Sequence, residues 1–383
     1  MSTTIEPFTV TIAEAQLDDL RTRLDLTRWE EQETVDDWSQ GVPLAKMKAL
    51  VDYWRNGYDW RRCEKILNDF GQFKTEIDGV DIHFLHVRSP HPNAMPLLMT
   101  HGWPGSVVEF FKVIGPLVDP VAHGGKAEDA FHVIAPSLPG YGFSGKPKVT
   151  GWNVQKVAAT WIKLMDRLGY DRWSAQGGDW GCAITAWIGH YEPKGLIGIH
   201  LNCPFLAPPE DQSDFTPEEQ QMFADRIEFY KWKAGYSAEQ STRPQTIGYS
   251  LVDSPVGLAS WIYEKFYDWT DHKGTVESIL TMDEVLDNIM LYWLPETGGS
   301  AARMYWESFR DLPFVPVPVP SGISIFPVEA HNASKRWCER YYTNLIYYNH
   351  TDQGGHFASF EQPDIFVDEV RKTFALLRQE SAR

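Results

Sequence analysis

Residues 177 to 181 read Gly177-Gly178-Asp179-Trp180-Gly181, and this stretch decides the fold. The apolar run 173–176 before it favours a β-strand, and the residues 182–190 after it favour a helix. A strand, a tight turn with the pattern Gly-x-nucleophile-x-Gly, and a helix are typical of a nucleophile elbow. The outer glycines remove side chains that would collide in such a turn. Because ordinary turns also favour Gly and Asp, the motif alone leaves that simpler interpretation open.

Outward from the elbow, short apolar runs alternate with amphipathic patterns. The clearest helical pattern covers 154–168 and ends at Gly169. An Asp78-Gly79 turn between two alternating runs predicts a hairpin over 73–88. Such alternation predicts the α/β class, with a mostly parallel sheet and helices on both faces. The predicted strands lie at 96–100, 132–135, 173–176, 197–201, 323–326 and 345–348.

Changes in composition and in hydrophobic pattern along the chain divide it into four segments. Residues 1–75 are charged and Trp-rich, and 76–203 hold the first strands together with the elbow. The interval 204–310 is helical in pattern and rich in Tyr and Trp, which predicts a lid over the carboxyl ends of the strands, where open α/β sheets bind ligands. Residues 311–383 return to strand and helix and complete the core.

Composition narrows the partners and the setting. The chain has 383 residues and a formal net charge of -17 at pH 7, which argues against nucleic acid and against a membrane surface as partners. Its four cysteines form no C-x-x-C pair, so we expect no zinc site and no disulfide framework. There is neither a signal-peptide pattern nor an apolar run of about 18 residues. A reducing, cytoplasmic setting fits these features best.

An aspartate in the elbow selects a particular chemistry. A carboxylate of ordinary pKa, about 3.9, is ionised at pH 7 and needs no base to activate it. Asp179 is therefore predicted to attack an sp3 carbon, displace an oxygen or a halide, and form an alkyl ester. Hydrolysis of that ester places negative charge on its carbonyl oxygen and calls for an oxyanion hole. We assign the backbone N–H groups of Trp103 and Trp180 to this hole, because the turn 101–104 directly follows an early strand.

A catalytic base and an acid should follow the nucleophile in the chain. His356, in the segment 354–357 after the last predicted strand, suits the base, with His331 and His350 as alternatives. Glu329 directly follows the strand before it and suits the acid that orients the imidazole. Asp352 competes for that role, but a residue four positions before the base on the same loop need not point at its ring.

These motifs together resemble the microsomal-type epoxide hydrolases, and the resemblance covers nearly the whole chain. It implies the α/β-hydrolase fold with an N-terminal meander over 1–75 and a helical lid over 204–310. We expect no N-terminal anchor helix, and in this respect the chain is more similar to the microbial members of the family. The matching segments are 24–29, 38–43, 101–106, 136–144, 177–181, 253–259, 264–266, 291–293, 326–329 and 354–357.

Two lid tyrosines activate the epoxide oxygen in the family that the chain resembles. Tyr236 lies ahead of the segment 242–244, Thr-Arg-Pro, as one of them does. Tyr305 completes a Ser-x-x-Arg-x-Tyr pattern over 300–305, as the other does. A buried tyrosine with a satisfied hydroxyl is the commoner role for any one of the 16 tyrosines, so each assignment depends on its local match.

The resemblance implies hydrolysis of an epoxide to a vicinal diol through an Asp179 ester, with no metal or organic cofactor. A small-molecule epoxide is the expected partner, and a homodimer is compatible with the resemblance. Two other functions stay open from the residues: a haloalkane or haloacetate dehalogenase using the same aspartate, and a non-catalytic ligand-binding protein.

Overall fold

A nine-stranded sheet forms the centre of the computed structural model, which describes residues 4–204, 206–329 and 331–380. The strand order is β1-β2-β3-β5-β4-β6-β7-β8-β9. Pairing is antiparallel from β1 through β2 and β3 to β5, and parallel from β5 through β4 to β9. The mostly parallel α/β sheet that the sequence predicts is therefore confirmed. The strands are β1 (Glu6–Phe8), β2 (Gln72–Ile77), β3 (Val80–Val87), β4 (Met95–Thr100), β5 (Phe131–Pro136), β6 (Trp173–Gly177), β7 (Leu196–Leu201), β8 (Ser321–Ile325) and β9 (Leu345–His350).

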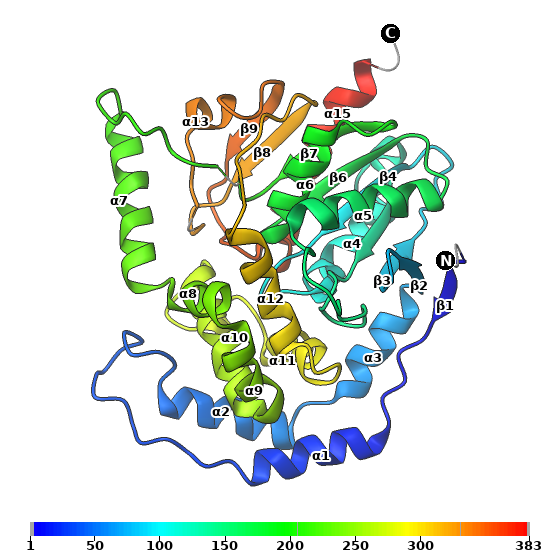
Figure 1. The fold of residues 1–383 in the computed structure, drawn as a ribbon. Helices are drawn as coiled ribbons and strands as arrows, with labels where there is room; N and C mark the ends of the chain where they lie inside the picture. Colours follow the sequence, from blue (N-terminus) through cyan, green and yellow to red (C-terminus); the bar gives the residue numbers. More distant parts are fainter. Residues whose placement is uncertain (1–3, 205, 330, 381–383) are drawn as a thin grey trace.

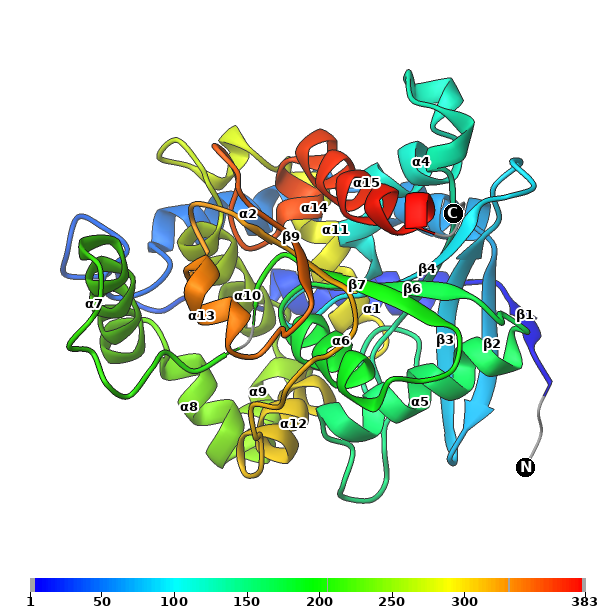
Figure 2. The ribbon, with the colours of Figure 1, turned by 90° about the horizontal axis from the view of Figure 1, so that it is seen from above.

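Helices cover both faces of this sheet, as predicted. Figure 2 shows α5 (Val154–Arg167) and α6 (Trp180–Tyr191) on one side, and α4 (Phe111–Val118) and α15 (Pro363–Glu380) on the other. Helix α5 begins where the Asn153 side chain accepts the Lys156 N–H at 3.0 Å, and it buries an apolar face that includes Trp161. Two short helices, α13 (Lys335–Glu339) and α14 (Ala358–Glu361), complete this part of the chain.

The predicted hairpin joins β2 and β3. Asp78 and Gly79, at its turn, both have positive φ angles, 53° and 81°, as a two-residue hairpin turn of this hand requires. Strand β1, which pairs with β2, was not expected from the sequence.

The N-terminal segment wraps around helices that come from much later in the chain. It contributes α1 (Glu14–Asp25), α2 (Leu44–Asn56) and α3 (Trp60–Asp69), and Figure 1 shows α1 and α2 beside α9 and α10. The Trp38 ring stacks on the Tyr267 ring of α10 with 3.8 Å between centroids and an interplanar angle of 4°. This packing fixes the N-terminal segment against the later helices.

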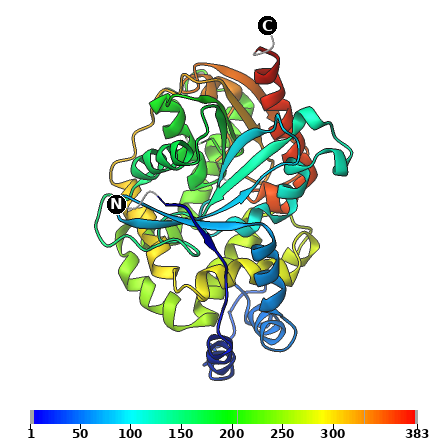
Figure 3. The same cartoon turned by 90° about the vertical axis from the view of Figure 1, so that its right-hand side faces the viewer.

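Six α-helices between β7 and β8, which we call the helical insertion, occupy the interval for which a lid is predicted. Figure 3 shows them at one end of the sheet, with the blue N-terminal helices beyond them. In the described part of the chain, no helix combines the length and the apolar character needed to cross a membrane. The helices are α7 (Pro217–Trp232), α8 (Gly235–Thr242), α9 (Pro244–Asp253), α10 (Pro255–Trp269), α11 (Met282–Trp293) and α12 (Gly298–Phe309).

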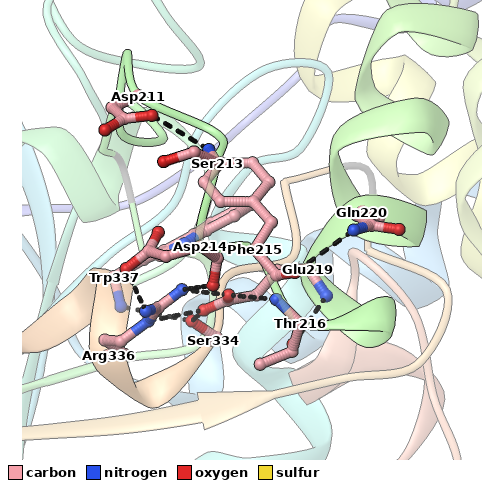
Figure 4. A network of polar contacts seen from close by, with 10 residues as sticks. All are labelled: Asp211, Ser213, Asp214, Phe215, Thr216, Glu219, Gln220, Ser334, Arg336 and Trp337. Carbon is pink, nitrogen blue, oxygen red and sulfur yellow. Dashed lines mark hydrogen bonds and ion pairs between the residues drawn. The ribbon is translucent and has the colours of Figure 1, made fainter.

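A polar network ties the start of the helical insertion to the core (Figure 4). Thr216 and Glu219 form a capping box at the start of α7. The buried Glu219 carboxylate also accepts hydrogen bonds from the Ser334 hydroxyl at 2.6 Å and from Arg336 Nε at 3.1 Å. Arg336 reaches Asp214 as well, at 2.7 Å. One buried carboxylate thus joins α7 to the start of α13.

Candidate active site

The elbow lies between β6 and α6. Asp179 has φ 53° and ψ -128°, a backbone conformation that is costly for a residue with a side chain and that recurs at functional sites. A Cβ atom on Gly181 would lie 2.6 Å from the Thr100 carbonyl carbon and still closer to its oxygen. Only glycine fits there, so the turn can press against the end of β4 while the Asp179 side chain projects above the sheet.

The loop after β4 holds the Asp179 carboxylate. The Trp103 N–H donates to Asp179 Oδ1 at 2.7 Å. A Cβ on Gly102 would lie 2.5 Å from Asp179 Cγ, so the absence of a side chain at 102 is what allows this approach. Trp180, whose N–H we also assign to the oxyanion hole, is the first residue of α6, and its ring lies 4.8 Å from that of Tyr305.

His356 bridges the nucleophile and Glu329. Its Nε2 lies 3.2 Å from Asp179 Oδ2, and its Nδ1 lies 2.7 Å from Glu329 Oε2. The Glu329 side chain is 1% exposed, whereas that of Asp179 is 21% exposed. Asp179 is therefore the accessible end of a buried Asp–His–Glu series, and Glu329 is placed to orient the imidazole.

The alternatives weighed from the sequence occupy other positions. His331 donates its N–H to Glu329 Oε1 at 3.2 Å and packs its ring on Phe229. His350 is exposed and pairs with the Tyr348 hydroxyl at 2.6 Å. Asp352 is exposed on the loop before His356. Of these residues, His331 alone reaches the series, and it does so through its backbone.

Charge separation within the series shifts both pKa values. Burial disfavours the imidazolium, but the Glu329 charge and the hydrogen bonds to Asp179 and Glu329 outweigh it and hold the pKa of His356 well above its usual range. Burial likewise opposes ionisation of Glu329, yet the His356 charge and hydrogen bond lower the pKa of this carboxyl to about 2. These contacts favour the imidazolium form of His356 beside an ionised Glu329.

Tyr236 and Tyr305 of the helical insertion pack against Trp103, the residue whose N–H holds the Asp179 carboxylate. The Tyr236 ring stacks on the Trp103 ring at 5.0 Å and 9°, and the Tyr305 ring meets Trp103 edge-on at 5.8 Å. Burial, with the nearby Asp179 charge adding to it, raises the pKa of Tyr236 well above its usual range. Burial does the same for the pKa of Tyr305. Both phenols are therefore neutral hydrogen-bond donors near Asp179.

Sequence reasoning missed several groups around the series. The Trp269 carbonyl accepts the His356 N–H at 2.8 Å, and its ring lies 4.9 Å from the imidazole. Burial raises the pKa of the half-buried Glu109 to about 8, with the His356 charge opposing and the Asp179 charge adding to this shift. No sequence pattern distinguishes Trp269 or Glu109 from the other tryptophans and acidic residues of the chain. Their role near His356 follows only from the tertiary structure.

Three side chains at the site are of types that can act as metal ligands. Cys203, Glu329 and His356 offer ligand atoms that all lie within 4.8 Å of one another. Glu329 and His356 already bond each other at 2.7 Å, however, so a metal would have to displace the contact that orients the imidazole. The arrangement therefore suits proton transfer better than metal binding.

A strained elbow between β6 and α6 of a mostly parallel sheet places the chain in the class of α/β hydrolases. The Asp179 carboxylate, its backbone N–H donor and the buried His–Glu pair are the arrangement expected of a member with an aspartate nucleophile. Two family models match the chain: "Epoxide hydrolase N terminus" over residues 5–110 and "alpha/beta hydrolase fold" over residues 95–245. Together they span the N-terminal segment, the elbow and the start of the helical insertion.

Full-length relatives agree with these models. The chain is 56% identical to a provisionally named epoxide hydrolase of Stigmatella aurantiaca (strain DW4/3-1), with 98% of this chain and 86% of the relative covered. It is 36% identical to epoxide hydrolase 1 of Sus scrofa, covering 98% and 90%. The crystal structure of juvenile hormone epoxide hydrolase from Bombyx mori matches with a TM-score of 0.91, 31% identity and coverage of 99% and 96%. The chain belongs to the epoxide hydrolase family.

Proposed function

We propose that the protein converts an epoxide and water into a vicinal diol through an ester on Asp179. The observation that carries the proposal is the placement of one carboxylate between two kinds of donor. The Trp103 N–H and His356 contact it at 2.7 and 3.2 Å, and the Tyr236 and Tyr305 rings pack on the ring of the same Trp103. A nucleophile, a base and two hydroxyl groups that donate hydrogen bonds are what opening an epoxide and hydrolysing the ester require.

In the first step, Asp179 forms a C–O bond to one epoxide carbon, and the bond from that carbon to the ring oxygen breaks. Oδ1, held by the Trp103 N–H, becomes the ester carbonyl oxygen, so Oδ2 is the attacking atom. Tyr236 and Tyr305 donate hydrogen bonds to the departing oxygen as it gains negative charge. This stabilisation grows toward the transition state, where it accelerates the reaction.

In the second step, water attacks the ester carbonyl carbon. Esterification neutralises Asp179 and thereby removes one of the charges that raise the pKa of His356. The imidazolium then passes its proton to the alkoxide, which becomes the first hydroxyl of the diol. The neutral imidazole accepts a proton from the attacking water, while Glu329 holds its orientation. The N–H groups of Trp103 and Trp180 stabilise the tetrahedral oxyanion. As it collapses, the imidazolium gives a proton to the departing oxygen, which becomes the second hydroxyl of the diol, and Asp179, left as the acid, loses its proton to the imidazole and is restored as the carboxylate.

We further propose that the helical insertion acts as the lid over 204–310, that residues 1–75 form the meander which fastens it, and that 76–203 and 311–383 make up the hydrolase core. The stacking of Trp38 on Tyr267 supports the first two assignments. The position of Tyr236 and Tyr305 on α8 and α12 supports a lid that supplies the groups activating the substrate.

A single turnover in heavy-oxygen water tests the covalent step. With enzyme in excess over an epoxide such as styrene oxide, the first diol should carry no label, because its new oxygen comes from Asp179. Label in that first diol would mean direct attack by water and would overturn the proposal. A chloroalkane assayed in parallel should release no halide, and halide release without epoxide hydrolysis would favour dehalogenation instead.

A further inference from the structure

Lys265 is a buried lysine on α10, with its side chain 2% exposed. Lysine is seldom fully buried unless its ammonium has a partner. Here Nζ pairs with the neighbouring Glu264 and lies 4.7 Å from the centroid of the Tyr236 ring and 5.8 Å from that of Trp269. The ammonium thus contacts the aromatic ring of a tyrosine that is proposed to activate the epoxide.

The other groups around Tyr236 make its phenol a weaker acid. Burial favours the neutral hydroxyl, and the charges of Asp179 and Glu329 oppose negative charge on its oxygen, whereas a hydrogen bond with Tyr305 favours it. The Trp103 ring stacks 5.0 Å away and carries no charge. A cation over the ring acts in the direction opposite to burial, because it draws electron density away from the phenol oxygen.

Contacts on both sides of α10 hold the ammonium in place. Glu264, its ion-pair partner, faces the N-terminal segment, where a Cβ on Gly41 would lie 3.7 Å from Glu264 Oε2. Trp38 of the same segment stacks on Tyr267, two residues further along the helix. The N-terminal segment therefore fixes the helix that carries the charge.

We infer that Lys265 is a positioning residue whose ammonium, lying over the Tyr236 ring, strengthens the hydrogen bond from Tyr236 to the epoxide oxygen. The inference rests on the proposed role of Tyr236. Since the epoxide oxygen becomes an alkoxide in the first step alone, Lys265 should accelerate ester formation and leave ester hydrolysis unchanged. Cation–π interactions of this kind correspond to about a 2- to 30-fold change in that rate.

Lys265→Met tests the inference, because methionine keeps most of the aliphatic stem and removes the charge. Ester formation in a single turnover should slow about 2- to 30-fold, with ester hydrolysis unaffected. Lys265→Arg should restore most of the rate, since it restores a cation. The matched control is Lys273→Met, which removes an exposed lysine from the same insertion and should leave both steps unchanged. Lys265→Gln, neutral but polar, provides a second variant should the methionine destabilise the fold.

A double-mutant cycle separates this role from a structural one. In a Tyr236→Phe background there is no phenol to strengthen, so Lys265→Met should cause no further loss in the rate of ester formation. Equal losses in both backgrounds, equal losses in both chemical steps, or no loss at all would overturn the inference. Tyr236→Phe alone tests the proposed function: if it leaves ester formation unchanged, the role of Tyr236 itself is wrong, whatever Lys265 does.

Discussion

Gly102→Ala should disable the nucleophile while leaving the fold intact. The added Cβ would lie 2.5 Å from Asp179 Cγ, whereas carbon atoms in contact are about 3.5–4.0 Å apart. The carboxylate must therefore move by about 1 Å, and its 2.7 Å hydrogen bond from the Trp103 N–H is lost. Removing one oxyanion donor costs about 10²- to 10³-fold, and a 1 Å misplacement costs about 10²-fold. Because one displacement causes both effects, we expect kcat to fall by about 10²- to 10³-fold in total.

Initial rates of diol formation, together with a thermal melt, measure this change. The new methyl group would also lie 2.5 Å from Asp179 Cβ, and rotation of the side chain cannot relieve that contact. We therefore expect the melting temperature to fall moderately, with the protein still folded at the assay temperature while activity is lost. Gly235→Ala is the matched control, since a Cβ at 235 would meet nothing within 4 Å. Near-normal activity in Gly102→Ala would refute the argument that this glycine exists to admit the carboxylate. If activity were lost only in proportion to the fraction of unfolded protein at the assay temperature, Gly102 would serve the fold instead.

Three further results are expected. His356→Gln should accumulate the ester, visible in intact-protein mass spectra as a gain of one substrate mass; continued diol release without an adduct would contradict the two-step route. In the ester the Glu329 charge still raises the pKa of His356, so the rate of ester hydrolysis should rise with pH and then level off. Glu329→Gln removes this charge, so it should move that rise to lower pH and reduce the plateau on the order of 10²-fold or more. Arg336→Met leaves the buried Glu219 without its cation and should lower the urea-derived free energy of unfolding by more than a control at an exposed pair does. The control Lys335→Met removes an exposed pair and should cost about 0.5 kcal/mol or less.

Most of the sheet could be predicted because its signals are local. Central strands such as β4 and β5 are buried on both faces and form short apolar runs, and α5 shows its apolar face at helical spacing. Strand β1 has three residues, one of them Pro7, which is too short to show alternation. Helix α14, with four residues, is likewise too short to reveal a period, so the sequence alone indicated one helix after His356 where the structure has two.

The residues of the candidate site could be predicted from the sequence for a different reason. Asp179, His356 and Glu329 each follow a strand of one parallel sheet, so topology alone brings them to one edge. The helical insertion obeys no such rule. Lys265 and Trp269 are ordinary members of an amphipathic helix, and their contacts with Tyr236 depend on how α10 packs against α8. Contacts between helices of an insertion are set by side-chain shape, which local sequence patterns do not encode.

Trp103 connects the two ends of the proposed chemistry. Its backbone N–H binds the Asp179 carboxylate, and its ring stacks on Tyr236, whose other neighbours include the Lys265 ammonium. The substrate carries no charge, so ring opening moves one negative charge from the carboxylate to the alkoxide. The N–H stabilises that charge before the transfer, and the polarised phenol stabilises it afterwards. Because Trp103 contacts both groups, it fixes the distance over which the charge moves. This explains why Gly102, beside it in the loop, leaves room for the carboxylate, and why the Trp103 ring packs against the helical insertion.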